Sequence, residues 1–232
     1  MSKPLATLTG LDRFTGVAPI FPLPSVALLP HVVQPLHVFE ERYRMLTADA
    51  LAGPRLMALA VLQPGWETRY ERNDLPLHPV VCLSQIEVDQ RLPDGRYLLL
   101  MRGLLRARIV SELTKGAAYR SCRLELLPDV YSPQPRVDRA VRRRQLLEQF
   151  LHLAPGVGEA AELPLVADGE LSLGALCDVL SFAAGFDTPT LLGLLNEPHV
   201  DVRSDRLLAA LLQRRSALQQ QAVPFPPQFS RN

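Results

Sequence analysis

Lysine, cysteine and aromatic residues are scarce in this chain of 232 residues. Only two of its 25 basic residues are lysines, Lys3 and Lys115, and aromatic residues make up 6% of the chain. Because the 25 basic residues and the 24 acidic residues nearly cancel, net charge does not direct the protein to nucleic acid or acidic lipid. The sequence contains no stretch of about 18 uncharged apolar residues, so we expect no membrane-spanning segment.

The three cysteines, Cys82, Cys122 and Cys177, are too few and too widely spaced for a disulfide framework or a zinc knuckle. We therefore expect three buried thiols in a reducing cytoplasm. The first 13 residues place charges around a short apolar run, which is not the pattern of a signal peptide.

Motifs of common catalytic sites are also missing. The sequence has no Walker A pattern, no G-x-S-x-G elbow and no H-E-x-x-H pair, and its two lysines are poorly placed to activate a serine. His31 and His37 stand six residues apart, where two ordinary polar side chains are favoured over a shared metal. We predict no catalytic residue, metal or cofactor.

The first half of the chain predicts mainly strands. Residues 19–30 hold four prolines yet are too apolar for solvent, which indicates an edge strand that enters a loop. A helix is predicted over 38–51, where Phe39, Tyr43, Leu46 and Ala50 share one face. Apolar runs and period-two alternation predict further strands at 56–62, at 105–109, at 122–126 and in a hairpin over 80–102 that turns at 93–95.

Residues 128–135 hold three prolines and no periodicity, and they separate these strands from a helical second half. There, a period of 3.6 predicts helices at 140–154, 173–184, 191–195 and 207–218, with Ser172 and Thr188 as N-caps and Gly185 after a C-terminus. The predicted units are an extension (1–17), a strand-rich unit (18–128), a linker (129–135), a helical unit (136–220) and a tail (221–232). For Phe225 and Phe229 in the tail, docking on a neighbouring copy and a free tail both remain open.

Several motifs follow one another in a set order. Residues 20–30 read I-F-P-L-P-S-V-A-L-L-P, and residues 35–43 read P-L-H-V-F-E-E-R-Y. Shorter matches follow at Ser84-Gln85-Ile86, at residues 94–97 (D-G-R-Y), at residues 103–109 (G-L-L-R-A-R-I) and at Tyr119-Arg120. Together they resemble the N-terminal, substrate-binding domain of Lon proteases over about residues 18–215.

The resemblance implies an α+β fold, with a PUA-like β-barrel and one helix followed by an all-α helical bundle. It also implies a non-enzymatic module that binds unfolded or tagged polypeptide, because the sequence stops where the ATPase and Ser-Lys peptidase domains of Lon would follow. The implied partners are polypeptide segments or a protease or chaperone, and a homodimer stays open.

Most residues of these motifs are interpreted as structural. Phe39 is expected to anchor the helix and Gly95 to form the hairpin turn. Glu40 and Arg42, two apart on the predicted helix, cannot face the same way, so the inward one is expected to form a fold-locking salt bridge. The complete set is Pro22, Leu23, Pro24, Pro30, Pro35, Leu36, Phe39, Glu40, Arg42, Tyr43, Asp94, Gly95, Arg96, Gly103 and Arg106.

Alternative functions rest on less evidence. Arg139, Arg142, Arg143 and Arg144 form the densest basic cluster, which is either a solvated helix surface or a patch for nucleic acid or an acidic partner. RNA binding is the first alternative, because PUA-like barrels also occur in RNA-binding proteins, although the neutral net charge and the lack of interleaved aromatics oppose it. An unrecognised hydrolase or metal enzyme using His31 and His37 is the second, and a structural adaptor is the third.

Overall fold

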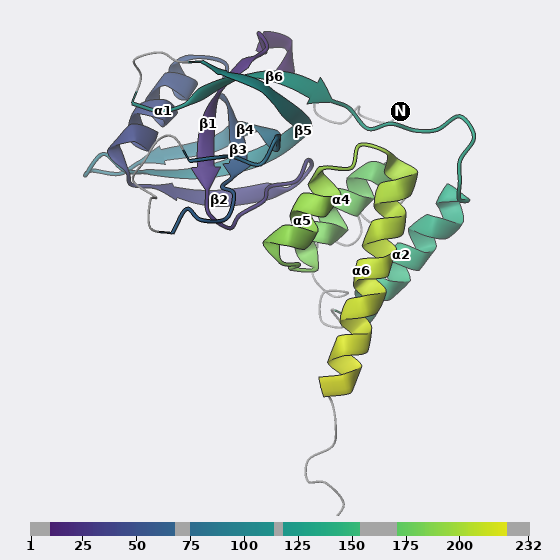
Figure 1. The fold of residues 1–232 in the computed structure, drawn as a ribbon. Helices are drawn as coiled ribbons and strands as arrows, with labels where there is room; N and C mark the ends of the chain where they lie inside the picture. The colour runs from purple at the N-terminus through teal and green to yellow at the C-terminus, as the bar shows by residue number, and fades with distance from the viewer. Residues whose placement is uncertain (1–9, 68–74, 114–117, 154–170, 222–232) are drawn as a thin grey trace, which may run out of the picture.

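The computed structural model describes residues 10–67, 75–113, 118–153 and 171–221. Within these residues, a mixed sheet of six strands comes first and most of the helices come second, so the fold is α+β as predicted (Figure 1). The strands are β1 (Val17–Leu23), β2 (Val33–Val38), β3 (Leu56–Val61), β4 (Val80–Arg91), β5 (Tyr97–Leu113) and β6 (Ser121–Leu127). The helices are α1 (Glu41–Ala52), α2 (Arg139–Leu153), α4 (Leu173–Ala183), α5 (Thr188–Leu195) and α6 (Val200–Gln221), with a 3-10 turn at Leu11–Arg13.

The strand pairings close the sheet on itself. Its order is β2-β5-β4-β3-β1-β6, and β6 also pairs with β5. Strand β5 makes this possible because it is 17 residues long: its first part pairs with β2, and its second part pairs with β6. All pairs are antiparallel except β1 with β3. We call these six strands the closed sheet.

Strand β1 differs from the predicted edge strand, because it lies between β3 and β6. Its prolines fit there because each missing N–H points to a side without a partner strand. The Ile20 N–H donates to the Arg120 carbonyl (2.8 Å), on the β6 side. Pro22, two residues on, faces the same side after the pairing with β6 has ended at Pro19. The prediction therefore missed that β1 is a central strand in which few backbone N–H groups are needed as hydrogen-bond donors.

Helix α1 begins at Glu41, three residues later than predicted, and this changes the roles of the residues before it. Val38 ends β2, and Phe39 is 60% exposed, so Phe39 does not anchor the helix. Glu40 precedes the helix in an extended conformation, which lets it form an ion pair with Arg42 (2.8 Å). An ion pair therefore joins Glu40 to Arg42, a pairing that the prediction excluded because it placed both residues within the helix.

The helical half consists of α2, α4, α5 and α6. The Ser172 side chain accepts from the Ala175 N–H and caps α4 as predicted, and Gly185 follows that helix with a φ of 63°. Asp187, not the predicted Thr188, caps α5 by accepting from the Thr190 N–H. The buried faces of two helices also differ from the prediction. Helix α2 buries Leu146 and Phe150, whereas Leu151 is exposed. In α6, Leu212 and Leu218 are exposed.

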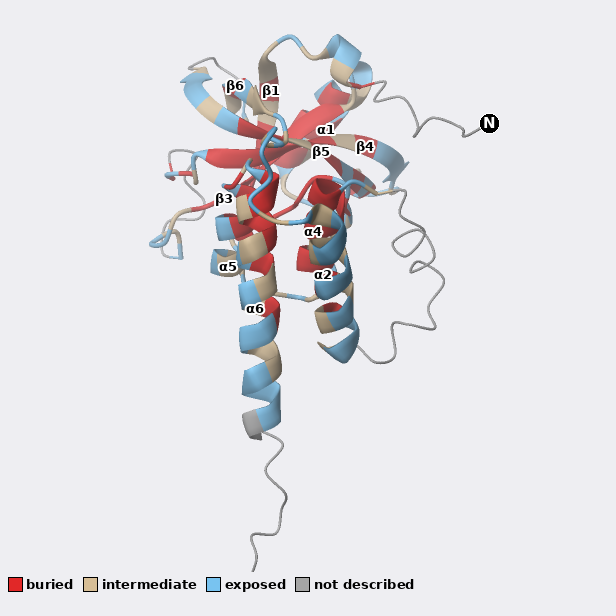
Figure 2. Ribbon diagram, turned by 90° about the vertical axis from the view of Figure 1, so that its right-hand side faces the viewer, coloured by how far each residue is buried: buried red, intermediate tan, exposed pale blue. Residues whose placement is uncertain are grey.

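Buried side chains gather in two clusters in the closed sheet and a third among the helices (Figure 2). The first sheet cluster includes three leucines of α5, so this helix belongs partly to the core of the sheet. All three cysteines are free and buried, as predicted, and burial raises the pKa of Cys82 to about 12. Among the described helices, none is long and apolar enough to cross a membrane.

Gly103 marks a close backbone approach in the closed sheet. It exchanges hydrogen bonds with the loop before β2: its carbonyl accepts from the His31 N–H and its N–H donates to the Val32 carbonyl, both at 2.9 Å. A Cβ atom on Gly103 would lie 2.1 Å from the Leu29 carbonyl oxygen and 2.9 Å from Cys82 Sγ. Only glycine fits this position without moving backbone.

We expect Gly103→Ala to destabilise the protein by about 1–3 kcal/mol, because the added methyl group must push the Leu29 backbone away from β5. Gly193→Ala is the matched control: a Cβ there meets nothing within 4 Å, and alanine favours a helix by about 1 kcal/mol. Urea denaturation of both variants measures the difference. Equal stability of the two variants would contradict the proposed clash.

Candidate functional site

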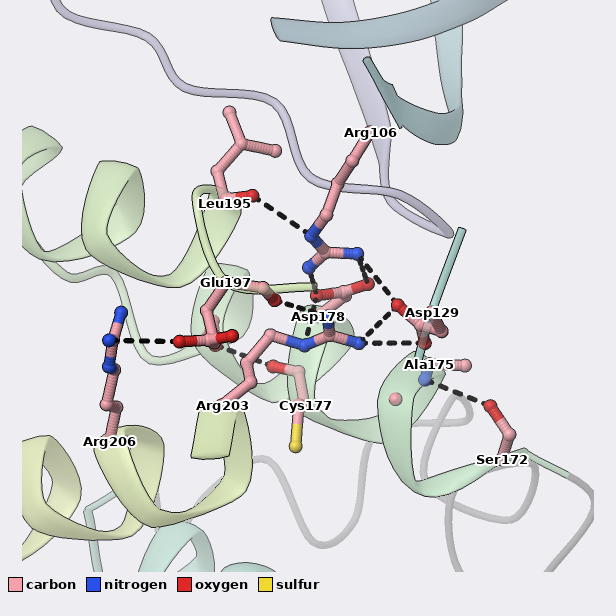
Figure 3. A network of polar contacts seen from close by, with 12 residues as sticks. Arg106, Asp129, Ser172, Ala175, Cys177, Asp178, Leu195, Glu197, Arg203 and Arg206 are labelled. Atoms are coloured by element: carbon pink, nitrogen blue, oxygen red, sulfur yellow. Dashed lines mark hydrogen bonds and ion pairs between the residues drawn. The ribbon is translucent and has the colours of Figure 1, made fainter. Parts of the chain in front are cut away.

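A buried ion pair joins the closed sheet to the helical half (Figure 3). Arg106 points out of β5 but is only 2% exposed, because helices cover it. Its guanidinium forms a bidentate ion pair with Asp178 of α4, with one N–O distance of 3.0 Å, and also donates to the Leu195 carbonyl at the end of α5 (3.1 Å). Bidentate arginine–carboxylate pairs fix orientation as well as distance.

A second arginine completes this network from α6. Arg203 is fully buried and donates to both carboxylate oxygens of Asp129, each at 2.8 Å, and to the Glu197 carbonyl. Asp129 also receives a contact from Arg106 at 3.3 Å. Two arginines and two aspartates therefore balance one another, as buried charges must. We call Arg106, Asp129, Asp178 and Arg203 the junction network.

The junction network has the features of a structural site. Both of its carboxylates are held in ion pairs by its arginines, an arrangement that favours a structural role. Sequence alternation placed Arg106 and Arg108 alike on the outside of β5, and only the packing of the helices distinguishes them. Asp178 carried an available signal, because it is a single acid within the apolar run Leu176–Leu180 of a helix.

The predicted basic cluster mostly faces partners inside the molecule. Arg139 forms a bidentate pair with Asp201 (2.8 and 3.1 Å) and lies 5.0 Å from the Tyr131 ring. Arg142 pairs with an α6 carboxylate at 2.6 Å, and Arg143 donates to a carbonyl, also at 2.6 Å. Arg144 is exposed. The contacts of Arg139 and Arg142 tie α2 to α6, and the three engaged arginines leave little of the cluster open to an acidic ligand.

The motif residues lie in several places. Asp94, Gly95 and Arg96 form the hairpin turn between β4 and β5, where Gly95 has a φ of 83° and Asp94 pairs with Arg96. His37 lies on β2, with its ring 5.9 Å from that of Phe39, whereas His31 lies in the loop bonded to Gly103. Among the described residues, no group of three or more His, Cys, Asp or Glu side chains is arranged to hold a metal ion.

Exposed apolar side chains gather on the outside of β2, β5 and β4. Strand register places Leu100 between Pro35 and Val88, and Leu98 between His37 and Gln90. These residues surround a hollow of about 420 Å³. Val88 is 53% exposed, and the group extends to Phe39 through its contact with His37. We call the exposed residues Val33, Phe39, Val88, Leu98 and Leu100 the outer face.

A second hollow, of about 510 Å³, lies between the closed sheet and α5. Its sheet side includes Leu62, Trp66 and His78, and its helix side is the face of α5 that carries Pro189, Leu192 and Gly193. Thr188 Oγ1 donates to the Ser25 carbonyl (2.7 Å) and links the two sides at one end. We call this hollow the junction cleft. The complete lining is Pro24, Val61, Leu62, Pro64, Trp66, Glu67, His78, Thr188, Pro189, Leu192, Gly193 and Asn196.

Residues 17–213, from β1 to α6, match the family described as the ATP-dependent protease La (LON) substrate-binding domain. The chain belongs to this family. Similar curated proteins include Lon protease 2 of Desulfotalea psychrophila, 29% identical over 62% of this chain, and the Lon protease of Xanthomonas oryzae pv. oryzae, 27% identical over 80%. The aligned parts cover only 18% and 20% of those relatives, so the chain spans about a fifth of their length.

Solved structures of Lon N-terminal domains have the same fold. A Lon N-terminal domain protein from Xanthomonas campestris matches with a TM-score of 0.61 and 21% identity, over 83% of this chain and 97% of that one. The N-terminal domain of the Mycobacterium avium complex Lon protease also gives 0.61, with 16% identity over 86% and 98%. The fold resemblance derived from the sequence motifs is thereby confirmed.

We expect Arg106→Met to destabilise the protein by about 3–5 kcal/mol, because it leaves Asp178 buried beside a single remaining arginine. Arg108→Met is the matched control on the same strand: its pair with Glu125 is exposed on both sides and contributes at most about 1 kcal/mol. Denaturant unfolding of both variants gives the comparison. Similar losses in the two variants would show that the junction network has no special role.

The pair between Arg139 and Asp201 predicts an acid-dependent stability. The hydrogen bond from Arg139 lowers the pKa of Asp201 below its usual value. Because the folded pKa is below the unfolded value of about 3.9, the pair stabilises the fold fully above about pH 4, and this is lost as the pH falls through the folded pKa. We expect Asp201→Asn to lower stability at pH 7 and to flatten its decline in acid. Urea denaturation from pH 7 to pH 2.5 measures this, and an unchanged profile would contradict it.

Proposed function

We propose that this chain is a non-enzymatic module that binds unfolded polypeptide on its outer face. The observation that carries this proposal is the apolar character of both sides of the β2–β5–β4 region. Leu99 and Met101 point into the core, whereas Leu98 and Leu100, their neighbours on β5, point to solvent. A solvent-facing antiparallel sheet normally carries polar residues at such positions. Contiguous exposed apolar side chains are typical of a binding surface.

The occupant we propose is an extended chain segment that presents apolar side chains. Membership of a family of substrate-binding domains supports such a ligand. The charges beside the outer face are paired, as in Arg102 with Glu87, so they do not favour a ligand of one sign. Burial of apolar surface is the remaining source of affinity. An unfolded chain exposes apolar residues that are buried in its folded state, and burial of these residues does not require a particular sequence.

The same proposal assigns the closed sheet to the PUA-like barrel class and the helical half to a supporting role. The junction network holds the helices against β5 through ion pairs that engage all four of its charged groups. The arginines of α2 are mostly engaged within the chain, so RNA binding gains no support from them. We infer that unfolded polypeptides bind to the outer face of this module. Any cleavage of a bound polypeptide is then carried out by another domain or protein.

The test is a double substitution, Leu98→Glu with Leu100→Glu, in the full chain. We expect affinity for a reduced, unfolded protein probe such as carboxymethylated lactalbumin to fall at least about tenfold, because two charges replace the central apolar contacts. Fluorescence anisotropy of the labelled probe measures the affinity.

Leu212→Glu is the matched control. Its side chain is 44% exposed on α6, compared with 41% and 38% for Leu98 and Leu100, and we expect binding to be unchanged. The thermal unfolding temperatures of both variants show whether a loss of binding comes from the changed surface or from unfolding of the protein. Undiminished binding by the folded double variant, or an equal loss in Leu212→Glu, would overturn the proposal.

A further inference from the structure

The junction cleft is lined for a ligand different from that of the outer face. Trp66, the single tryptophan of the chain, lies there together with three prolines, Pro24, Pro64 and Pro189. Gly193 leaves its helix side open, since a Cβ atom there would meet nothing within 4 Å. A shallow groove lined by an aromatic residue is the usual receptor for a proline-rich segment, which is held extended before it binds.

The chain itself contains such a segment just after α6. Residues 222–232 read A-V-P-F-P-P-Q-F-S-R-N, with three prolines and with Phe225 and Phe229 four residues apart. In a polyproline II conformation, four residues span about 12 Å. The part of α5 that lines the cleft runs from Thr188 to Asn196, and eight helical steps of about 1.5 Å each span about 12 Å. Both phenylalanines could therefore bind within one cleft.

Charge also matches. Among the described residues that line the cleft, Glu67 is the one acidic residue, and none of them is lysine or arginine. Arg231 is the one charged side chain of residues 222–232. A pair between these residues would fix the direction of the bound segment, at little gain in affinity because Glu67 is exposed.

Geometry directs this segment to another molecule. Arg206 of α6 donates to the Gly193 carbonyl (3.1 Å), so the middle of the cleft lies level with Arg206. The end of α6 at Gln221 is 15 residues further, about 22 Å along the helix axis, and α6 points away from the closed sheet (Figures 1 and 2). Four further residues reach at most about 14 Å. Phe225 therefore cannot enter the middle of its own cleft. Phe229 can reach it, because eight residues span up to about 28 Å, so both phenylalanines fill one cleft together only if that cleft belongs to a second copy.

We propose that the junction cleft of one molecule binds residues 222–232 of a second copy of this chain. Phe225 and Phe229 are the anchors, and the part of the cleft lined by Trp66 and Gly193 receives them. The contact is separate from the outer face, so client binding and self-association are independent properties of the molecule.

Two variants of the full chain separate the two halves of this contact. Phe225→Ala with Phe229→Ala removes the anchors and keeps the cleft. Gly193→Arg fills the cleft and keeps the anchors, on an exposed helix face where arginine is a better helix former than glycine. Sedimentation equilibrium should show concentration-dependent association of the unsubstituted chain, none in either variant alone, and association again when the two variants are mixed.

Trp66 provides a direct readout of the cleft. A peptide of residues 222–232, added to the Phe225→Ala, Phe229→Ala chain, should shift the tryptophan emission to the blue in a saturable way. The same peptide with both phenylalanines changed to alanine should bind at least about tenfold more weakly, and the Gly193→Arg chain should give no shift. If Gly193→Arg fails to fold, this titration still tests whether the two phenylalanines bind in the cleft, because it compares two peptides on one protein.

Three results would overturn the proposal. The first is an unsubstituted chain that stays monomeric at several hundred micromolar. The second is a peptide that leaves Trp66 emission unchanged or binds equally well without its phenylalanines. The third is a Trp66 shift that depends on Phe225 and Phe229 but not on protein concentration, which would mean that the segment folds back on its own molecule.

Discussion

The bidentate pair between Arg106 and Asp178 is the interaction on which the arrangement of this molecule depends. It forms where β5 of the closed sheet meets α4, and Arg203 and Asp129 complete its charge balance from α6 and from the segment after β6. None of these four charges can be buried alone without a large desolvation cost. The sheet and the helices must therefore dock in one relative orientation, in which all four groups are satisfied together.

That orientation also creates the junction cleft. Helix α5 packs Leu191, Leu192 and Leu195 into the core of the closed sheet, and the carbonyl of Leu195, its last residue, accepts from the Arg106 guanidinium. Held at both places, α5 presents Pro189 and Gly193 beside Trp66. The outer face, in contrast, depends on strand register alone, because β2, β5 and β4 bring its side chains together by pairing. The outer face is thus formed by strand pairing within the sheet, whereas the junction cleft is formed by the packing of α5 against the sheet.

Several local signals in the sequence were reliable. The hairpin turn at Gly95, the Ser172 cap and the burial of Tyr43, Leu46 and Ala50 follow from turn chemistry and periodicity. Helix starts were less exact, since Asp187 and not Thr188 caps α5. A larger error concerns strand pairing between segments far apart in sequence. Pro22 was read as an edge residue, yet it occupies a central strand whose unpartnered side accepts a proline. Phe39 continued the apolar period of α1, but Glu40 remains extended, and the helix begins after it.

The sequence by itself determined the family, the α+β class and the change from strands to helices, because the motifs and the apolar period follow the chain in order. It did not predict β2 (Val33–Val38), which forms only by pairing with β5. Only the tertiary structure decided which charges are structural. Arg106 and Arg108 are identical in sequence terms, two residues apart on one side of β5, yet one is 2% exposed and the other pairs with Glu125 in solvent. The physical reason is that burial depends on what packs against a side chain, and here the covering helices come more than 70 residues later in the chain.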